Sequence, residues 1–234
     1  MSQNQKIKAA IILCAGYGKR LKPLTHQCPK PLLKINKITL LENNIKLIKK
    51  IGIKKIYLNS FHLKNKIFNY VNKNNFDIPI KVIEDGKLIL GTGGGIKNIL
   101  SKTNDQNFIV FNPDTIWNKN YINCIIKMRD IFIKKKLNNI LLVVNKKLSF
   151  DRLLNGDFQL EKGKLKRSKF NKYIYTGCQI FNRELFKKIT KETFSMQYIW
   201  NQQLKKGNLY GIESLNTFKH ITDIRIYKKL SKSN

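Results

Sequence analysis

Short apolar runs alternate with amphipathic stretches along the first 145 residues of the chain. Each run has the length and the isoleucine and valine content of a buried strand. The runs lie at residues 9–13, 54–59, 78–83, 108–111 and 140–144. Between them, apolar residues recur every three or four positions, as in helices that cover a sheet, at residues 38–51, 62–74, 95–100 and 121–136. The alternation predicts an α/β fold, Rossmann-like, with a mixed, mostly parallel sheet and helices on both faces.

Beyond residue 145 the pattern is less regular. Two short segments, 157–161 and 164–166, predict a hairpin, and the run at 173–181 predicts a longer strand. Gly177 lies inside that strand, and a glycine in a strand often marks a place where a ligand approaches the backbone. Helices are expected at 183–189 and 196–206, short strands at 208–213 and 218–222, and a helix at the C-terminus. Because no linker or repeat divides the chain, the sequence predicts a single domain over residues 1–234.

Lysine dominates the charged residues and gives the chain a formal net charge of +32. Such a charge raises the question of a nucleic-acid partner. However, only six of the 46 basic residues are arginine, and the lysines are spread along the whole length. Lysine also accompanies heavy use of isoleucine and asparagine, which share A/T-rich codons. We therefore expect no specific nucleic acid, and only weak attraction to polyanions at low salt; a polyanion-binding module is favoured by charge alone.

Membrane and secretion signals are not evident in the sequence. No stretch approaches the run of about 18–20 apolar residues that a membrane-spanning helix needs. Residues 1–6 lead directly into the first predicted strand, which leaves no room for a secretion signal. The four cysteines are scattered without C-x-x-C spacing, so neither a zinc site nor a disulfide framework is indicated. We expect a cytoplasmic protein with reduced thiols, without membrane association.

The segment that follows the first predicted strand carries the clearest chemical signal. Gly16 and Gly18 would let backbone N–H groups approach a polyphosphate closely, because no Cβ intervenes. Arg20 and Lys30 supply the positive charge that such a ligand requires. The prolines on either side of Lys30 are expected to hold it on a stiff extended segment, with its ammonium group aimed at the ligand.

Two common phosphate-binding patterns do not fit. The dinucleotide fingerprint needs a third glycine where Leu21 stands, and residues 91–97 lack the Gly-Lys-Ser/Thr spacing of the ATPase phosphate loop. Residues 15–33 instead resemble the signature of the sugar-1-phosphate nucleotidyltransferases. The matching positions are Gly16, Gly18, Arg20, Pro23, Leu24, Thr25, Pro29, Lys30 and Pro31. The resemblance implies the nucleotide-diphospho-sugar transferase fold, with residues 1–145 as the nucleotide-binding half and residues 146–234 as a small sugar-phosphate-binding half.

The resemblance also implies roles for single residues. Arg20, Lys30 and Asp114 would act in catalysis, which transfers a nucleotidyl group from a nucleoside triphosphate to a sugar 1-phosphate. The first glycine loop would bind the nucleotide through Ala15, Gly16, Tyr17, Gly18 and Lys19. A second glycine cluster resembles the base-recognition loop that precedes a helix, here expected to start at Gly95. Its predicted nucleotide-binding residues are Gly91, Thr92, Gly93 and Gly94.

Asp114 is the best candidate for a metal ligand. It lies just past the end of an apolar strand, where ligands sit in open α/β sheets. Mg²⁺ prefers carboxylate oxygens together with substrate phosphates, so one or two acidic residues suffice. The resemblance places a second metal ligand late in the chain, where the best register gives His220, with Asp223 three residues further on. Because histidine is a poor magnesium ligand, the second position stays open between Asp223, His220 and no residue.

The sugar phosphate is expected near Asn59 and His62, past a strand end, and near Thr176 and Gly177, which resemble the family's sugar-contacting strand. Within the family the chain most resembles N-acetylmuramate-1-phosphate uridylyltransferases of peptidoglycan recycling. Mannose-1-phosphate guanylyltransferases and phosphocholine cytidylyltransferases are alternatives, and a non-catalytic nucleotide-binding homologue is a further one. We expect a monomer or a small homo-oligomer, with a nucleoside triphosphate and a sugar 1-phosphate as its partners.

Overall fold

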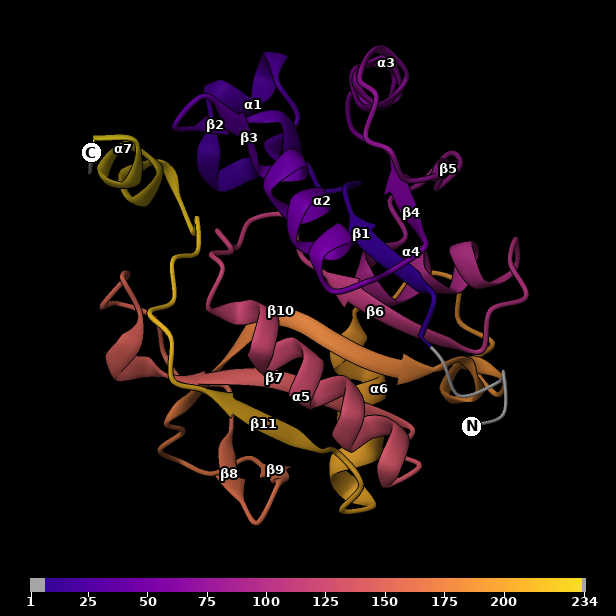
Figure 1. Ribbon diagram of the computed structural model, residues 1–234, viewed down its shortest axis with the longest axis vertical. Coiled ribbons are helices and arrows are strands. Elements are labelled where there is room, and N and C mark those ends of the chain that lie inside the picture. The colour runs from indigo at the N-terminus through magenta and orange to yellow at the C-terminus, as the bar shows by residue number, and fades with distance from the viewer. Residues whose placement is uncertain (1–6, 233–234) are drawn as a thin grey trace.

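A computed structural model describes residues 7–232 and gathers seven strands into one sheet (Figure 1). The strand order is β11-β7-β10-β6-β1-β4-β5, and only β10 in this sheet runs antiparallel to its neighbours. The strands are β1 (Ala9–Leu13), β4 (Lys55–Ser60), β5 (Ile80–Glu84), β6 (Asn107–Phe111), β7 (Asn139–Asn145), β10 (Tyr173–Asn182) and β11 (Gly211–Ser214). The predicted mixed, mostly parallel sheet is confirmed. The expectation about a secretion signal concerns residues 1–6, which lie outside the described residues.

Helices cover both faces of the sheet, as the apolar pattern predicts. The main helices are α2 (Leu40–Lys50), α3 (Lys64–Lys73), α4 (Gly91–Leu100), α5 (Tyr121–Lys134), α6 (Met196–Lys205) and α7 (Ile224–Lys232). Side chains alternate across β1, so that Ala10 and Ile12 pack in the core with α2, α3 and α5. Ala9 and Ile11 face the opposite core with α4 and α6. In Figure 1, α2 and α5 lie in front of the sheet.

The C-terminal end of the chain returns to the N-terminal region. Ile226 and Leu230 of α7 share a buried cluster with Leu21, Leu33 and Leu40. Figure 1 accordingly shows α7 beside α1 (Leu24–Gln27) and the hairpin of β2 (Lys34–Ile35) and β3 (Ile38–Thr39). Residues from both ends of the sequence therefore meet in one buried cluster. Among residues 7–232, no helix has the length and apolar content that crossing a bilayer requires.

Several element boundaries differ from the prediction for local reasons. The helix expected from residue 38 begins at Leu40, because Ile38 and Thr39 pair with the preceding strand. Thr39 then caps the helix, and its Oγ1 accepts a hydrogen bond of 3.0 Å from Glu42 N. The helix expected at 183–189 is a 3₁₀ turn, Arg183–Phe186. The short strand expected at 208–213 lies at Gly211–Ser214.

The expected strand at 218–222 is wrong. This segment joins no sheet, and its strand-like pairing is limited to two isolated bridges, from Phe218 to Ser149 and from His220 to Thr115. The hairpin of β8 (Gln159–Glu161) and β9 (Lys164–Lys166) is present as predicted. Because β10 lies between β6 and β7, strands from both halves of the chain belong to one continuous sheet.

Candidate functional site

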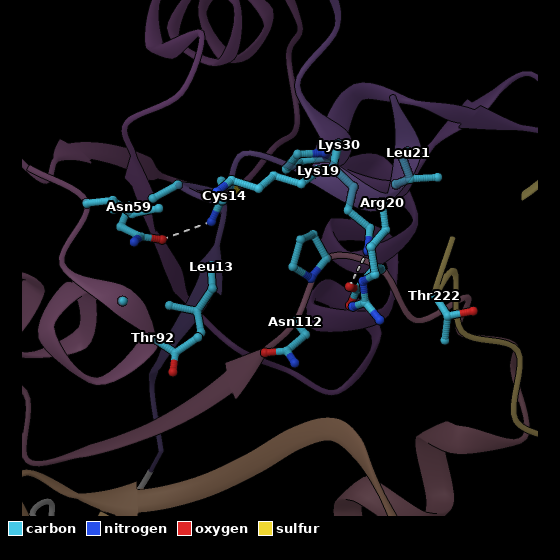
Figure 2. A pocket seen from close by; sticks show the side chains of 18 residues that line it. Leu13, Cys14, Lys19, Arg20, Leu21, Lys30, Asn59, Thr92, Asn112 and Thr222 are labelled. Carbon is cyan, nitrogen blue, oxygen red and sulfur yellow. Dashed lines mark hydrogen bonds and ion pairs between the residues drawn. The ribbon is translucent and has the colours of Figure 1, made fainter. Parts of the chain in front are cut away.

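A cleft of about 330 Å³ lies where the parallel strands β1, β4 and β6 end. This carboxyl edge is the usual ligand position in open α/β sheets. Figure 2 shows Asn59 and Thr92 at one side of the cleft and Arg20 and Thr222 at the other, with Asn112 between them. The predicted residues that line it are Ala15, Gly16, Gly18, Lys19, Arg20, Lys30, Asn59, Gly91, Thr92 and Asp114. The structure thus brings residues of both glycine clusters to one cavity, together with the three predicted catalytic residues, Arg20, Lys30 and Asp114.

Eight other predicted residues do not line this cleft. They are Tyr17, His62, Gly93, Gly94, Thr176, Gly177, His220 and Asp223. The cleft is also lined by Leu13, Cys14, Leu21, Pro31, Ile89, Asn112, Pro113 and Thr222, which sequence reasoning did not select. Most of these flank a selected residue in the chain, so a wider window around each motif would have found them. Thr222 is among them, because it directly precedes the selected Asp223.

The first glycine loop uses its two glycines differently. Gly18 has a left-handed backbone, with φ +63°, and a Cβ there would lie 2.7 Å from Thr25 Cγ2. Thr25 Oγ1 donates a 3.0 Å hydrogen bond to Gly18 O, which closes the loop on itself. A Cβ on Gly16 would meet no atom within 4 Å. Gly18 is therefore needed by the loop, whereas Gly16 leaves open space beside the backbone for a ligand.

Arg20 and Lys30 present two kinds of positive charge to the cleft. Arg20 is exposed and makes no hydrogen bond or ion pair with the rest of residues 7–232. Lys30 does not lie on an extended segment as expected, because it begins the 3₁₀ turn Lys30–Leu32 directly after Pro29. Its side chain is only 13% exposed, and its Nζ donates to Asp114 Oδ2 at 2.6 Å. The Lys30 ammonium is therefore held in place, and a protein partner rather than the prolines aims it.

Asp114 is an ionised carboxylate at the floor of the cleft. Burial by itself would raise its pKa, but the charge of Lys30, the charge that His220 carries when it is protonated, and the Lys30 hydrogen bond lower the pKa to about 2. The carboxylate is 16% exposed, and its buried Oδ1 has no hydrogen-bond partner. An ionised carboxylate that lines the cleft fits the magnesium that the resemblance implies.

His220 packs behind Asp114 and does not line the cleft. Burial lowers the pKa of His220, since the imidazolium is costly to desolvate, so the ring is uncharged at neutral pH. Its Nδ1 lies 3.5 Å from Asp114 Oδ1 and 3.2 Å from Thr115 Oγ1. Thr115 Oγ1 donates its hydroxyl hydrogen to Thr176 O at 2.6 Å. It can therefore only accept from His220, so the hydrogen of the His220 ring lies on Nδ1. His220 thus presents an N–H toward Asp114.

Asp223 caps a helix and does not line the cleft. Its Oδ1 accepts a 2.8 Å hydrogen bond from Ile226 N at the start of α7, and Arg225 lies 3.7 Å from its Oδ2. Within residues 7–232, no group of three or more histidine, cysteine, aspartate or glutamate side chains is arranged to hold a metal. A magnesium ion here would be held by Asp114 together with ligand phosphates.

Thr176 and Gly177 support the floor of the cleft from below. Thr176 is fully buried, and its Oγ1 donates to Leu142 O at 2.8 Å. Gly177 has φ +90°, and a Cβ there would lie 3.0 Å from Asn112 Cβ. Asn112 N donates to Gly177 O at 2.8 Å. The glycine in this strand therefore admits a neighbouring protein segment, and the prediction that it marks a ligand approach has no geometric support.

The second glycine cluster lies inside a helix. The helix starts at Gly91 and not at Gly95, so the glycines form its first turns. The N–H groups of Gly93 and Gly94 donate to Phe194 O at 2.9 and 3.1 Å. They are therefore not free to bind a nucleotide base, contrary to the prediction. A Cβ on Gly93 would lie 2.3 Å from the Phe194 ring, and one on Gly94 would lie 2.1 Å from Glu192 O. Gly91 and Thr92 line the cleft, while Gly93 and Gly94 pack against the segment at 192–194.

Asn59 links the cleft to a buried acid that sequence reasoning missed. Its Oδ1 accepts from Cys14 N at 2.8 Å, and its Nδ2 donates to Asp85 Oδ2 at 2.9 Å. Asp85 is 6% exposed, and burial raises its pKa. A Cβ on Gly95 would lie 2.5 Å from Asn59 Nδ2. The amide of Asn59 thus fixes the end of β1. Asp85 could have been selected from the sequence because it directly follows the strand β5.

Tyr17 and His62 meet outside the cleft. Their ring centroids are 5.4 Å apart, and Tyr17 also packs edge-on against Phe61. His62 Nε2 lies 2.9 Å from Thr25 O. These contacts tie the tip of the first glycine loop to the connection after β4, so both residues support the loop from its outer side.

The chain is similar in sequence to known proteins. The family model described as "Nucleotidyl transferase" matches residues 9–149. The chain is 31% identical over 205 residues to the D-glycero-alpha-D-manno-heptose 1-phosphate guanylyltransferase of Campylobacter jejuni, covering 84% of this chain and 86% of that protein. It is 24% identical over 230 residues to the N-acetylmuramate alpha-1-phosphate uridylyltransferase of Caulobacter vibrioides, covering 95% and 94%.

Solved structures of similar fold extend over the whole chain. HddC from Yersinia pseudotuberculosis matches with a TM-score of 0.75 at 22% identity, covering 97% of this chain and 99% of that one. The inositol-1-phosphate CTP transferase from T. maritima matches with a TM-score of 0.77 at 16% identity, covering 97% of each. At these identities the matches establish the fold.

Proposed function

Because the chain belongs to the nucleotidyl transferase family, we propose that it joins N-acetylmuramate 1-phosphate to UTP and releases pyrophosphate. That the chain is a sugar-1-phosphate nucleotidyltransferase follows from its family and its relatives. In the proposed reaction a phosphate oxygen of the sugar 1-phosphate forms a bond to the α-phosphorus of the nucleotide. The bond from that phosphorus to the bridging oxygen breaks, and the electron pair leaves with pyrophosphate.

The observation that carries the proposal is the pairing of Lys30 with Asp114. These residues lie 84 positions apart in the sequence, yet Lys30 Nζ and Asp114 Oδ2 meet at 2.6 Å within the cleft that Gly16, Gly18 and Gly91 line. A fixed cation, an ionised carboxylate and open backbone at Gly16 are the groups that a polyphosphate with its counter-ion requires. No surface pair of lysine and aspartate elsewhere in residues 7–232 combines these three features.

The positions of the residues in the cleft support a role for each in the proposed reaction. Backbone N–H groups at Gly16 and Gly18, with the unpaired Arg20, would hold the β- and γ-phosphates. Lys30 would offset the repulsion between the acceptor phosphate and the α-phosphate. Asp114 would hold Mg²⁺, which supplies positive charge to the phosphate oxygens when it is bound. No side chain needs to act as a general base, because a phosphate monoester is already ionised near neutral pH.

A second pair of substrates has its own support. The guanylyltransferase relative that acts on D-glycero-alpha-D-manno-heptose 1-phosphate is the more identical of the two full-length relatives, at 31% against 24%. GTP with this heptose 1-phosphate is therefore the second candidate. Peptidoglycan recycling and a cytoplasmic location are proposed only together with the first pair.

A coupled pyrophosphate assay tests the proposal. The purified protein with Mg²⁺ is offered each of four nucleoside triphosphates with each of several sugar 1-phosphates, including the two named above. We expect sustained release for one nucleotide and one sugar phosphate, with UTP and N-acetylmuramate 1-phosphate giving the highest kcat/KM. Release with GTP and the heptose 1-phosphate would favour the second candidate. Nucleotide binding without release for any pair would show a non-catalytic homologue.

A further inference from the structure

The two oxygens of the Asp114 carboxylate lie in different surroundings. Oδ2 accepts the hydrogen bond from Lys30 Nζ at 2.6 Å. Oδ1 is buried, has no hydrogen bond, and has His220 Nδ1 3.5 Å away. His220 is held there by Thr115 and by the ring of Phe218, which stacks on it with centroids 5.6 Å apart. The inner oxygen is therefore enclosed by protein, and the outer oxygen is the one with a replaceable partner.

The Lys30 ammonium is also engaged on the protein side. Besides Asp114, it donates to the main-chain oxygen of Ile221 at 2.8 Å. An ammonium group has three donors, so two of them serve these contacts. Ile221 is itself fixed, because its N–H donates to Asp114 O at 2.9 Å. Lys30 therefore has to change partners before it can give a phosphate its full share of hydrogen bonds.

The geometry points to an exchange of partners at this ion pair: a divalent cation takes Asp114 Oδ2 from Lys30, and Lys30 passes to a substrate phosphate. The exchange rests on the proposed function, since the phosphate is that of the nucleotide or the sugar 1-phosphate. It makes the ion pair a device that couples the two ligands. A cation that binds alone takes Asp114 from Lys30 and leaves the ammonium without its partner, and a phosphate that binds alone leaves the carboxylate without its partner. When both ligands bind, the ion pair is broken only once and each charged group has a new partner.

Competition for one oxygen makes an exchange necessary. A cation that approached Asp114 from the cleft would meet the Lys30 ammonium on the same oxygen, and two positive charges at such distances repel strongly. The inner oxygen, Oδ1, offers no alternative, because it is buried. The coupling must be reciprocal, so that phosphate raises the affinity for the cation by the factor by which the cation raises the affinity for phosphate.

The first test measures Mn²⁺ binding by titration calorimetry, with no nucleotide or sugar phosphate present. We expect Lys30→Gln to bind Mn²⁺ more tightly than the wild type by about tenfold, within the usual range for coupled sites. Lys19→Gln removes a positive charge from the same cleft without a contact to Asp114, so it measures the general electrostatic effect. If Lys30→Gln binds no more tightly than Lys19→Gln, the exchange is wrong.

The second test measures the opposite side with inorganic pyrophosphate and no metal. Asp114→Asn releases Lys30, so we expect pyrophosphate to bind about tenfold more tightly than to the wild type. Asp223→Asn is the matched control, since it removes one negative charge while asparagine still caps α7. Weaker or equal binding by Asp114→Asn, relative to this control, would overturn the proposal.

A third measurement needs no substitution and covers the case in which either variant fails to fold. Reductive methylation of the wild-type protein, followed by mass spectrometry of its peptides, reports how accessible each lysine amine is. Without metal, Lys30 should react more slowly than Lys19, and Mn²⁺ should raise the Lys30 rate several-fold while leaving that of Lys19 unchanged. An unchanged Lys30 rate at saturating Mn²⁺ contradicts the exchange.

These results are separable from the proposed reaction. Pyrophosphate release in the substrate panel with no effect of Lys30→Gln on Mn²⁺ affinity would refute the exchange and leave the reaction standing. Tighter Mn²⁺ binding by Lys30→Gln with no release for any substrate pair would refute the reaction and leave the ion pair as a coupling device for anions.

Discussion

The two glycine clusters of this chain have similar composition and opposite surroundings. In the first, a Cβ on Gly16 would meet nothing within 4 Å, so the backbone borders open space in the cleft. In the second, Cβ atoms on Gly93 and Gly94 would strike Phe194 and Glu192, so the glycines make room for protein. A glycine-rich sequence therefore indicates close approach, but it does not say whether a ligand or another part of the chain approaches.

The two glycine clusters also differ in the charged groups that lie beside them. Lys30 and Asp114 stand beside the first loop, whereas the N–H groups of Gly93 and Gly94 are paired with Phe194 O. The first region can thus bind an anion and its counter-ion, and the second mainly fixes the segment that leads into α6. The following predictions separate these two roles by measuring activity at one region and stability at the other.

Removal of the Lys30 charge should have the largest effect. We expect Lys30→Ala to lower kcat by about 10²–10³-fold, the usual loss when one charge-stabilising donor is removed. Steady-state pyrophosphate release measures this, with thermal unfolding to confirm that the variant is folded. Lys50→Ala, at the exposed end of α2, is the control and should keep the wild-type rate. A near wild-type kcat for Lys30→Ala would remove Lys30 from the reaction.

A methyl group on the second cluster should cost stability. A Cβ on Gly94 would lie 2.1 Å from the main-chain oxygen of Glu192, which cannot rotate away as a side chain would. We expect Gly94→Ala to lower the free energy of unfolding by about 1–3 kcal/mol, as overpacked sites do. Urea unfolding measures it. Gly94→Ala with wild-type stability would show that the segment at 192–195 does not dock there.

Protonation of Asp114 in acid should lower the free energy of unfolding. Its pKa in the folded protein is lowered to about 2 from an ordinary value of 3.8, so its ionised form is favoured by folding. The sign follows: this stability is fully present above about pH 4 and is lost as the pH falls toward 2. The loss should be about 2 kcal/mol. It is measured by urea unfolding from pH 6 to pH 2.5.

Asp114→Asn provides the control for this acid effect. The variant lacks the titrating carboxyl, so its stability should fall less steeply between pH 4 and pH 2.5 than that of the wild type. Equal slopes for the two proteins would mean that another carboxyl governs the transition. The second cluster contains no ionisable group among its glycines, and Gly94→Ala should therefore shift stability by the same amount at every pH.

The sequence predicts those features that depend on local pattern. The strands around β1, β4, β5, β6 and β7 follow from short apolar runs, since each run must be buried wherever it lies. Lys30 and Asp114 follow from a motif and from the position after a strand. The second partner of Lys30, the main-chain oxygen of Ile221, could not be predicted, because a main-chain oxygen has no sequence signature and Ile221 lies 191 residues from Lys30.

The late part of the site shows why the remainder escapes prediction. Residues 218–222 look like a strand, yet they pair only at single positions with Ser149 and Thr115. Thr222 reaches the cleft because its hydroxyl donates to the buried Asp151 at 2.7 Å, a contact between segments 71 residues apart. Such placement depends on the assembled fold, and a reading of neighbouring residues cannot supply it.

The smallest expected effect on stability tests the first glycine directly. Because a Cβ on Gly16 would meet no atom within 4 Å, Gly16→Ala should change the free energy of unfolding by no more than about 0.5 kcal/mol. The same methyl group would stand where a polyphosphate approaches the backbone, so the KM for the nucleoside triphosphate should rise several-fold with little change in kcat. Initial rates at varied nucleotide concentration measure this. Unchanged KM in a stable Gly16→Ala protein would show that the nucleotide does not approach the first loop, and the contrast between the two clusters would then be one of packing alone.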